Sequence, residues 1–297
     1  MSVRINGRTK LAGVAGWPLD HTLSPAMHNA AYEDMGLDAV YVPLPVRNES
    51  ELARLVSAVR VLPFLGFNVT MPFKRAVLEL CDEVAAQARL AGAVNTVHCA
   101  DGRLIGYNTD GRGLLQSLAD EAGFNAEGKS VALVGAGGAA GAALVAFVVS
   151  RAARVAIVNR TKDRAEQLIE AIGPHARTTA LAAVALDDAR EDVSGADLVV
   201  NATPVGMNGS GEMPIPAGWL RRGQIVADMV YRPAVTPLLR AAAEAGAKGV
   251  GGLGMLVAQG AMAIDIWAGG DGARAPRDVM RAAADEALSA EREGAGA

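Results

Sequence analysis

The stretch VALVGAGGAAGAALV, residues 131–145, constrains the fold more than any other part of this chain. The apolar run Val131–Val134 predicts a buried strand, and the glycine-rich segment after it predicts a tight turn into a helix. In such a strand-turn-helix unit, Gly135 permits the turn, Gly137 lets the backbone approach a pyrophosphate, and Ala140 keeps the helix close to the strand. Because small residues also ease close packing, the strand-turn-helix placement is what favours a dinucleotide site.

The start of that helix is the expected anion site, because backbone N–H groups at a helix N-terminus point toward a bound phosphate. The residues expected to line the cofactor there are Gly135, Ala136, Gly137, Gly138 and Ala139.

The next apolar run, RVAIVN (154–159), decides which cofactor to expect. It ends roughly 20 residues beyond the first glycine, where an NAD site usually places an acidic residue on the ribose 2′-hydroxyl. Here the chain has Asn159, Arg160 and Thr161, with Arg164 one helical turn later. A guanidinium binds a 2′-phosphate by charge-assisted hydrogen bonds, so NADP(H) is predicted. The alternative is a pair of solvated arginines, which the N-terminus of a helix disfavours.

Short β-rich runs alternate with alanine-rich stretches along the chain, which predicts an α/β fold with parallel strands. The expected strands are 12–16, 39–44, 66–70, 131–135, 154–159, 197–203 and 224–230. The expected helices are 25–35, 50–60, 111–122, 139–150, 162–172, 236–245 and 254–267. A loop is expected at 207–218, and a frayed tail at EREGAGA, 291–297.

The composition narrows the class of partner. A chain of 297 residues is long enough for two domains, and its net charge of −4 without a basic cluster argues against binding nucleic acid or an anionic membrane. No apolar run reaches the roughly 18 residues of a membrane span, and the start lacks the apolar core of a secretory signal, so a cytoplasmic protein is expected. Cys81 and Cys99 lack metal-ligand spacing, so neither a metal site nor a disulfide is predicted. With these classes excluded, the expected partner is a small molecule.

Two polar residues outside the glycine-rich unit are candidates for chemistry. Lys74 closes the stretch NVTMPFK, and if it begins a helix after Pro72 its ammonium lies near the end of the strand that stops at Thr70, where open α/β sheets bind ligands. Asp110 follows a hairpin-like Asp-Gly turn and a short strand. The alternatives are a solvated lysine and an aspartate that only caps a helix.

At this point the chain resembles the shikimate dehydrogenase family along almost its whole length. The matching motifs are HTLSPAMHNAA (21–31), NVTMPFK (68–74), AGAVNTV (91–97), GYNTDGRGLL (106–115), VGAGGAAGA (134–142), NRTKDRA (159–165), NATPVGM (201–207), DMVY (228–231) and GLGMLVAQ (252–259). The resemblance implies an NADP(H)-dependent oxidoreductase that interconverts 3-dehydroshikimate and shikimate in aromatic amino-acid biosynthesis. It also implies that Lys74 is the catalytic lysine and Asp110 its partner.

The same resemblance assigns further site residues. It implies that ring hydroxyls of the substrate are bound by Thr70, Asn95, Asp110 and Gln259. The hydroxyls of Thr22 and Ser24 are expected to bind the substrate carboxylate, and the resemblance implies that Tyr231 lies near that carboxylate. It places Met229 and Gly252 at the nicotinamide and Thr203 at the border of the cofactor. Ser24, followed by a proline, is also expected as a helix N-cap.

One departure from the family bears on the substrate. The family usually has Ser-x-Ser where this chain has Thr22-Leu23-Ser24, which adds a methyl group beside the carboxylate. A quinate or aminoshikimate dehydrogenase on the same scaffold is therefore the main alternative, since one methyl group changes discrimination by about 1 to 3 kcal/mol. A non-catalytic NADP-binding regulatory module would not need both Lys74 and Asp110, and a folate-type dehydrogenase would not explain the substrate motifs.

The resemblance also sets the expected architecture. An N-terminal α/β substrate domain would comprise 1–110 and 252–297, with the C-terminal helices returning to it, and a Rossmann-type doubly wound NADP-binding domain would comprise 111–251. The family includes monomers and homodimers.

Overall fold

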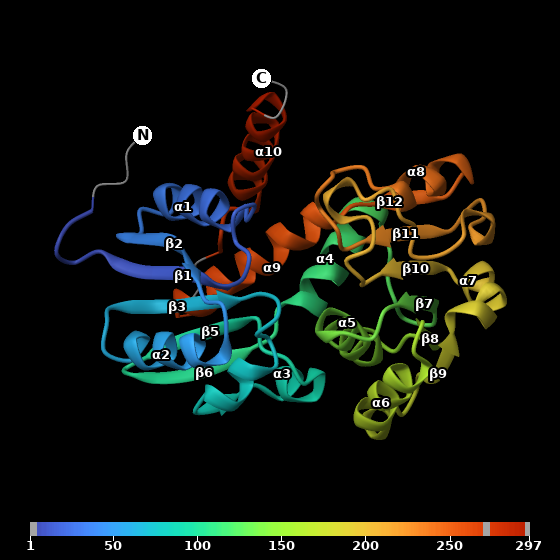
Figure 1. The fold of residues 1–297 in the computed structure, drawn as a ribbon, viewed down its shortest axis with the longest axis horizontal. Coiled ribbons are helices and arrows are strands. Elements are labelled where there is room, and N and C mark those ends of the chain that lie inside the picture. Colours follow the sequence, from blue (N-terminus) through green and yellow to red (C-terminus); the bar gives the residue numbers. More distant parts are fainter. Residues whose placement is uncertain (1–4, 270–273, 295–297) are drawn as a thin grey trace. The chain divides into compact units, whose positions relative to one another are not determined.

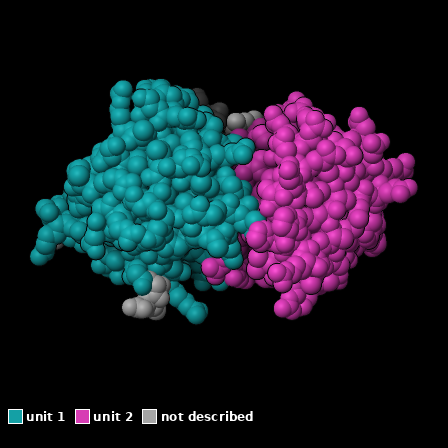
Figure 2. Space-filling view, turned by 90° about the horizontal axis from the view of Figure 1, so that it is seen from below, with its two compact units in different colours: residues 1–109, 257–297 teal, residues 110–256 magenta. Residues whose placement is uncertain are grey.

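A computed structural model describes residues 5–269 and 274–294. The chain forms two compact units, one within residues 1–109 and 257–297 and the other within 110–256 (Figures 1 and 2). We call them unit 1 and unit 2. Each unit contains one six-stranded sheet with helices around it, so the predicted α/β class is confirmed.

The sheet of unit 1 is mixed, in the order β2-β1-β3-β5-β6-β4. Its strands are β1 (Lys10–Gly16), β2 (Ala39–Pro45), β3 (Phe64–Val69), β4 (Glu83–Val84), β5 (Thr96–Ala100) and β6 (Arg103–Tyr107). β5 is antiparallel to both of its neighbours, and the other pairs are parallel. The hairpin between β5 and β6 turns at Asp101 and Gly102, both with positive φ, as the Asp-Gly pair predicts.

Helices pack against this sheet, and in Figure 1 α1 lies beside β2 while α2 overlaps β5 and β6. They are α1 (Ser24–Asp34), α2 (Glu49–Val59), α3 (Ala86–Ala91), α10 (Arg277–Gly294) and the end of α9 (Gly252–Trp267), with a 3₁₀ helix at Ala76–Leu80. The amphipathic α2 buries Leu52, Val56 and Val59 in a core shared with Phe67 and Val97 of the sheet.

The sheet of unit 2 is entirely parallel, in the order β12-β11-β10-β7-β8-β9. Its strands are β7 (Ser130–Val134), β8 (Arg154–Asn159), β9 (Ala180–Ala185), β10 (Leu198–Asn201), β11 (Ile225–Asp228) and β12 (Lys248–Val250). Counted within the unit, this is the 3-2-1-4-5-6 order of a doubly wound dinucleotide-binding sheet. The strand order reverses between β7 and β10, where such sheets bind ligands.

The helices of unit 2 connect these strands. They are α4 (Asp110–Ala122), α5 (Gly138–Val149), α6 (Lys162–Ile172), α7 (Arg190–Gly195) and α8 (Pro237–Glu244), with short 3₁₀ helices at Gly173–His175, Leu186–Asp188, Met207–Gly209 and Ala217–Trp219. α5 is apolar all round and almost wholly buried, as a helix at the centre of a layered domain must be.

Several predicted boundaries move for identifiable reasons. β10 ends at Asn201 rather than residue 203, because the Asn201 side chain accepts a hydrogen bond from the Thr203 N–H and turns the chain. β11 ends at Asp228 rather than residue 230, because the Asp228 carboxylate accepts from the Val230 N–H in the same way.

Two local predictions were wrong, and the condition attached to Lys74 is not met. Lys74 does not begin a helix: residues 71–75 form turns and the 3₁₀ helix starts at Ala76, while β3 ends one residue before Thr70. Ser24 is not the N-cap of α1 but its first residue, and the Thr22 hydroxyl accepts from the Ser24 N–H at 3.4 Å. The expected frayed tail is helical as far as Gly294, and residues 295–297 lie outside the described residues.

Candidate functional site

One edge of the unit 1 sheet gathers most of the predicted substrate residues. The carboxyl ends of β1, β3 and β6 meet there, and the antiparallel β5 begins there. The polar residues placed at this edge are Thr22 and Ser24 after β1, Thr70 and Lys74 after β3, Asn95 before β5, and Thr109 after β6. We call it the carboxyl edge of unit 1. Separate stretches of sequence thus converge on one place, as in other open α/β sheets that bind ligands.

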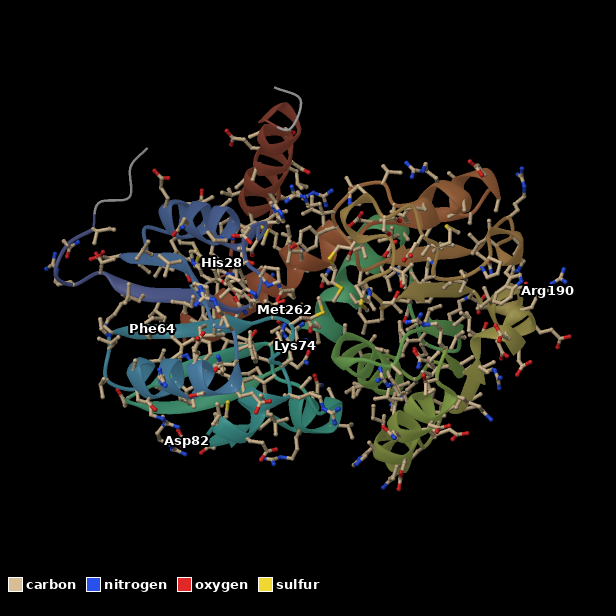
Figure 3. The ribbon with its side chains drawn as sticks, viewed as in Figure 1. His28, Phe64, Lys74, Asp82, Arg190 and Met262 are labelled. Atoms are coloured by element: carbon tan, nitrogen blue, oxygen red, sulfur yellow. The ribbon has the colours of Figure 1, made fainter. Side chains whose placement is uncertain are left out.

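Backbone hydrogen bonds fix Lys74 at this edge. The carbonyl of Lys74 accepts from the Val94 N–H at 2.8 Å, so the lysine lies beside the residue that precedes Asn95. The Thr70 N–H donates to the Ala15 carbonyl at 2.9 Å, which holds the start of the same turn against β1. The Lys74 side chain is half-buried, and Figure 3 labels it beyond the end of β3.

Asn95 is the centre of a buried polar cluster. Its Oδ1 accepts from the Thr109 N–H at 2.8 Å and from the Thr96 hydroxyl at 2.9 Å. Its Nδ2 donates to Thr109 Oγ1 at 2.9 Å and to Gln259 Oε1 at 3.2 Å. Asn95, Thr96, Thr109 and Gln259 are all buried, so each polar atom needs such partners. The cluster brings the predicted Asn95 and Gln259 together across 164 positions of sequence.

Gln259 reaches this cluster because α9 is anchored on β5. The Trp267 indole N–H donates to the Val97 carbonyl at 2.9 Å, at the far end of the same helix. Gln259 lies inside α9 rather than capping it. A helix tied to β5 at Trp267 can therefore present Gln259 at a fixed place.

The start of α1 is held by a buried histidine. His28 Nδ1 lies 2.8 Å from the Ser24 carbonyl, one helical turn earlier, and its ring stacks on Tyr41 with a centroid distance of 4.0 Å. Burial lowers the pKa of His28 to about 4, more than the hydrogen bond to Ser24 raises it, so the ring is neutral. Since a carbonyl only accepts, Nδ1 carries the proton, and this N–H fixes the backbone of Ser24.

In unit 2 the glycine-rich turn lies at the point where the strand order reverses. Gly135 has φ +115°, and a Cβ there would lie 3.0 Å from Thr203 Cγ2 and 3.1 Å from the Ala202 carbonyl. The predicted Gly135 and Thr203 are therefore neighbours, one after β7 and one after β10.

The helix that follows suits a bound anion. α5 begins at Gly138, its N-cap Gly137 offers no side-chain acceptor, and its first turn contains no acidic residue. The N–H groups of Gly138, Ala139 and Ala140 therefore have no capping side chain, and a Cβ on Gly137 would meet nothing within 4 Å. This open, uncapped N-terminus fits a pyrophosphate.

The residues expected to select the cofactor follow β8. Asn159 is half-buried and donates from Nδ2 to the Thr161 carbonyl at 2.8 Å, which orders the turn into α6. Arg160 and Arg164 are exposed, and neither forms an ion pair within the described part of the chain. Two exposed guanidinium groups and no carboxylate at the end of β8 suit a 2′-phosphate.

A second buried network orders the loops after β10 and β11. Asp228 accepts from Asn201 Nδ2 at 2.9 Å and from the Thr236 hydroxyl at 2.6 Å, and burial raises its pKa despite these hydrogen bonds. The loops carry Thr203 and Met229. Gly252 packs on the second loop so closely that a Cβ would lie 2.4 Å from the Met229 carbonyl oxygen.

The remaining predicted residues lie in unit 2. Asp110 is the buried first residue of α4, directly after Thr109, and Tyr231 is half-buried three residues beyond β11.

Four residues around Asn95 were not predicted. They are Thr96 and Thr109 of the polar cluster, and behind them Asn68, whose Nδ2 donates to Thr96 Oγ1 at 3.1 Å, and Tyr41, whose hydroxyl donates to Asn68 Oδ1 at 2.8 Å. Asn68 carried a usable signal, since an amide inside the apolar run FLGFNV must find buried partners.

Other classes of site find no support in the described residues. They contain no group of three or more histidine, cysteine or acidic side chains placed to hold a metal ion. Within the same residues, every helix is too short or too polar to span a bilayer.

Comparison with known proteins gives a consistent result. A model of the shikimate dehydrogenase substrate binding domain matches residues 14–97, and a model of shikimate/quinate 5-dehydrogenase matches residues 117–207. A shikimate dehydrogenase (NADP(+)) of Geobacter sp. (strain M21) is 47% identical over 267 residues, 89% of this chain and 92% of that protein. One of Methanopyrus kandleri is 43% identical over 297 residues, 97% of this chain and 99% of that protein.

A solved structure is similar over nearly the whole fold. The shikimate 5-dehydrogenase of Thermus thermophilus, in complex with NADP(H) and shikimate, superimposes with a TM-score of 0.84 at 38% identity, over 94% of this chain and 100% of that one.

Proposed function

The chain belongs to the shikimate dehydrogenase family, and on that basis we propose that it catalyses the reversible, NADP(H)-dependent reduction of 3-dehydroshikimate to shikimate. The observation that carries the proposal is the carboxyl edge of unit 1, where Lys74, Asn95 and Gln259 come from three distant segments. A hydroxylated, anionic ring needs such a set of donors around one cation.

We propose that unit 1 supplies most of the residues that bind the substrate. Ser24 and Thr22 would donate hydrogen bonds to the substrate carboxylate, with Tyr231 nearby. Thr70, Asn95, Asp110 and Gln259 would bind the ring hydroxyls. In support, the buried amides of Asn95 and Gln259 are already held by hydrogen bonds, so binding costs little side-chain entropy.

Lys74 is the proposed catalytic residue, with Asp110 as its partner. During reduction negative charge grows on the carbonyl oxygen, and the Lys74 ammonium would stabilise that oxygen and donate a proton to it. Asp110 would pair with the Lys74 ammonium and bind a substrate hydroxyl. Because the interaction of Lys74 is strongest when the charge has developed, it would contribute more to turnover than to binding.

We propose that unit 2 binds NADP(H), which supplies the hydride. The N-terminus of α5 would bind the pyrophosphate through backbone N–H groups. Arg160 and Arg164 would bind the 2′-phosphate, with Asn159 and Thr161 shaping the turn. Thr203, Met229 and Gly252 would lie along the nicotinamide half. The uncapped α5 and the exposed arginines support this assignment.

A second candidate is quinate oxidation by the same machinery. The observation in its favour is Thr22, whose hydroxyl accepts from the Ser24 N–H and whose added methyl group changes the shape of the carboxylate pocket. Aminoshikimate is the other candidate substrate.

The test is the initial rate of nicotinamide reduction at 340 nm with shikimate or quinate and with NADP or NAD. Fast turnover with shikimate and NADP is the expected result. A clear preference for quinate would change the proposed substrate but leave the proposed catalytic and cofactor-binding residues unchanged. If neither acid is oxidised with either cofactor, the proposed function is wrong. Light scattering on the same sample would tell a monomer from a homodimer.

A further inference from the structure

We infer that Tyr41, Asn68 and Thr96 form a chain of positioning residues that makes Asn95 a hydrogen-bond donor toward the substrate. The inference rests on the proposed function, because it concerns how Asn95 meets a substrate hydroxyl. None of the three is expected to touch the substrate. All lie within unit 1, behind the carboxyl edge.

The chain starts at the Tyr41 hydroxyl, which donates to Asn68 Oδ1 at 2.8 Å. This bond fixes the orientation of the Asn68 amide, with Oδ1 toward Tyr41. Asn68 Nδ2 then points to the Asn95 carbonyl at 3.2 Å and to Thr96 Oγ1 at 3.1 Å. Because a carbonyl only accepts, the amide assignment at Asn68 is supported from both ends.

The next step passes through Thr96. Its hydroxyl oxygen accepts from Asn68, so its proton is left for Asn95 Oδ1, at 2.9 Å. The Thr109 N–H also donates to that oxygen, at 2.8 Å. With its oxygen taken up on the protein side, Asn95 has only Nδ2 to turn toward the substrate. The Nδ2 protons now go to Thr109 Oγ1 and Gln259 Oε1, so a bound substrate would take the place of one of these acceptors. The recognised group must therefore be an acceptor, as a substrate hydroxyl oxygen is.

The Tyr41 ring is held independently of its hydroxyl. It stacks on His28 and lies 6.3 Å from the Trp267 ring, and its side chain is almost fully buried. Tyr41→Phe should therefore keep the packing and remove one donor. The loss leaves Asn68 Oδ1 buried without its donor and loosens every later bond in the chain.

Tyr32 provides a matched control. It is a second buried tyrosine beside His28, with ring centroids 6.3 Å apart, and its hydroxyl has no hydrogen-bond partner among the described residues. Tyr32→Phe makes the same chemical change without touching the chain. Thr96→Val and Thr96→Ser form a second matched pair, since only serine keeps the hydroxyl.

The experiment measures kcat and KM for shikimate and for NADP in these variants, with thermal melting of each. Tyr41→Phe and Thr96→Val are expected to raise the KM for shikimate about tenfold, with kcat and the KM for NADP unchanged. Tyr32→Phe and Thr96→Ser should match the wild type. A loss of packing alone would lower the melting temperature without this split between KM and kcat.

A double-mutant cycle with Asn95→Ala tests whether the chain acts through Asn95. In the Asn95→Ala background, Tyr41→Phe should add no further rise in KM. If Tyr41→Phe behaves like Tyr32→Phe, or if its effect multiplies fully with that of Asn95→Ala, the positioning chain is refuted. If the wild type does not oxidise shikimate at all, the proposed function fails instead, and the two failures are thereby distinguished.

Discussion

His28 should make unit 1 sensitive to acid. Its Nδ1–H donates to the Ser24 carbonyl, while Nε2 is buried without a hydrogen-bond partner among the described residues. Protonating Nε2 would place a positive charge among Tyr32, Tyr41 and Trp267 with nothing to pair it. Burial accordingly lowers the pKa of His28 to about 4, from an ordinary 6.5.

The direction of this pH dependence follows from the linkage between proton binding and folding. A histidine whose pKa is lowered by folding binds its proton more readily in the unfolded chain. Its contribution to the free energy of unfolding is therefore complete above pH 6.5 and is lost as the pH falls toward 4. With pKa values of 6.5 and about 4, the free energy of unfolding should fall by about 2 kcal/mol at pH 5 and about 3 kcal/mol at pH 4 from this residue alone.

The perturbation is His28→Asn, because an asparagine amide can still donate to the Ser24 carbonyl but does not titrate. Urea unfolding followed by circular dichroism at pH 7, 6, 5 and 4 gives the free energy of unfolding of both proteins. The variant should be less stable at pH 7, since it loses the stacked ring, and the difference should shrink by about 2 kcal/mol at pH 5. Two curves that stay parallel from pH 7 to 4 would refute the reasoning.

Four further substitutions test the site. Lys74→Met should lower kcat at least about a hundredfold while shikimate still binds, by calorimetry; substantial residual turnover would remove Lys74 from the mechanism. Arg160→Asp should raise the KM for NADP about tenfold and leave that for NAD nearly unchanged, whereas equal losses would exclude a phosphate contact. Thr22→Ser should raise the ratio of kcat/KM for shikimate over quinate about fivefold or more; an unchanged ratio would show that Thr22 does not set the substrate preference. Gly252→Ala should lower stability by about 1 to 3 kcal/mol and raise the KM for NADP, because its Cβ would lie 2.4 Å from the Met229 carbonyl oxygen; a wild-type melting curve would contradict this.

The parallel sheet of unit 2 was readily predicted from the sequence because its signals are local. Its buried strands are short apolar runs, and α6 runs from Lys162 to Ile172 as the helical pattern predicts. The prediction missed β9 and β12, two edge strands. The β9 sequence ALAAVA is mostly alanine, which favours a helix, and the β12 sequence KGV is short with a single β-branched residue.

The predicted strand ends were wrong where a side chain competes with the backbone for hydrogen bonds. Asn201 and Asp228 both end strands by accepting from N–H groups two residues later, although the apolar pattern around them continues. The conformation around Lys74 was not predicted for a related reason. It is set by long-range backbone hydrogen bonds, such as that from the Val94 N–H to the Lys74 carbonyl, which give no signal in the local sequence.

The polar cluster shows what a residue-by-residue assignment leaves out. Asn95 and Gln259 were predicted because the family resemblance assigns them a role in substrate binding. The direction in which the Asn95 amide points depends on Asn68 and Thr96, which come from separate strands and were given no role. Asn68 and Thr96 lie opposite each other because β5 runs antiparallel between β3 and β6, so that its first residues lie where its neighbours end. A parallel strand would carry the polar start of β5 to the opposite edge of the sheet. The reversal of this one strand is therefore what allows an amide that precedes it to join the lysine that follows β3.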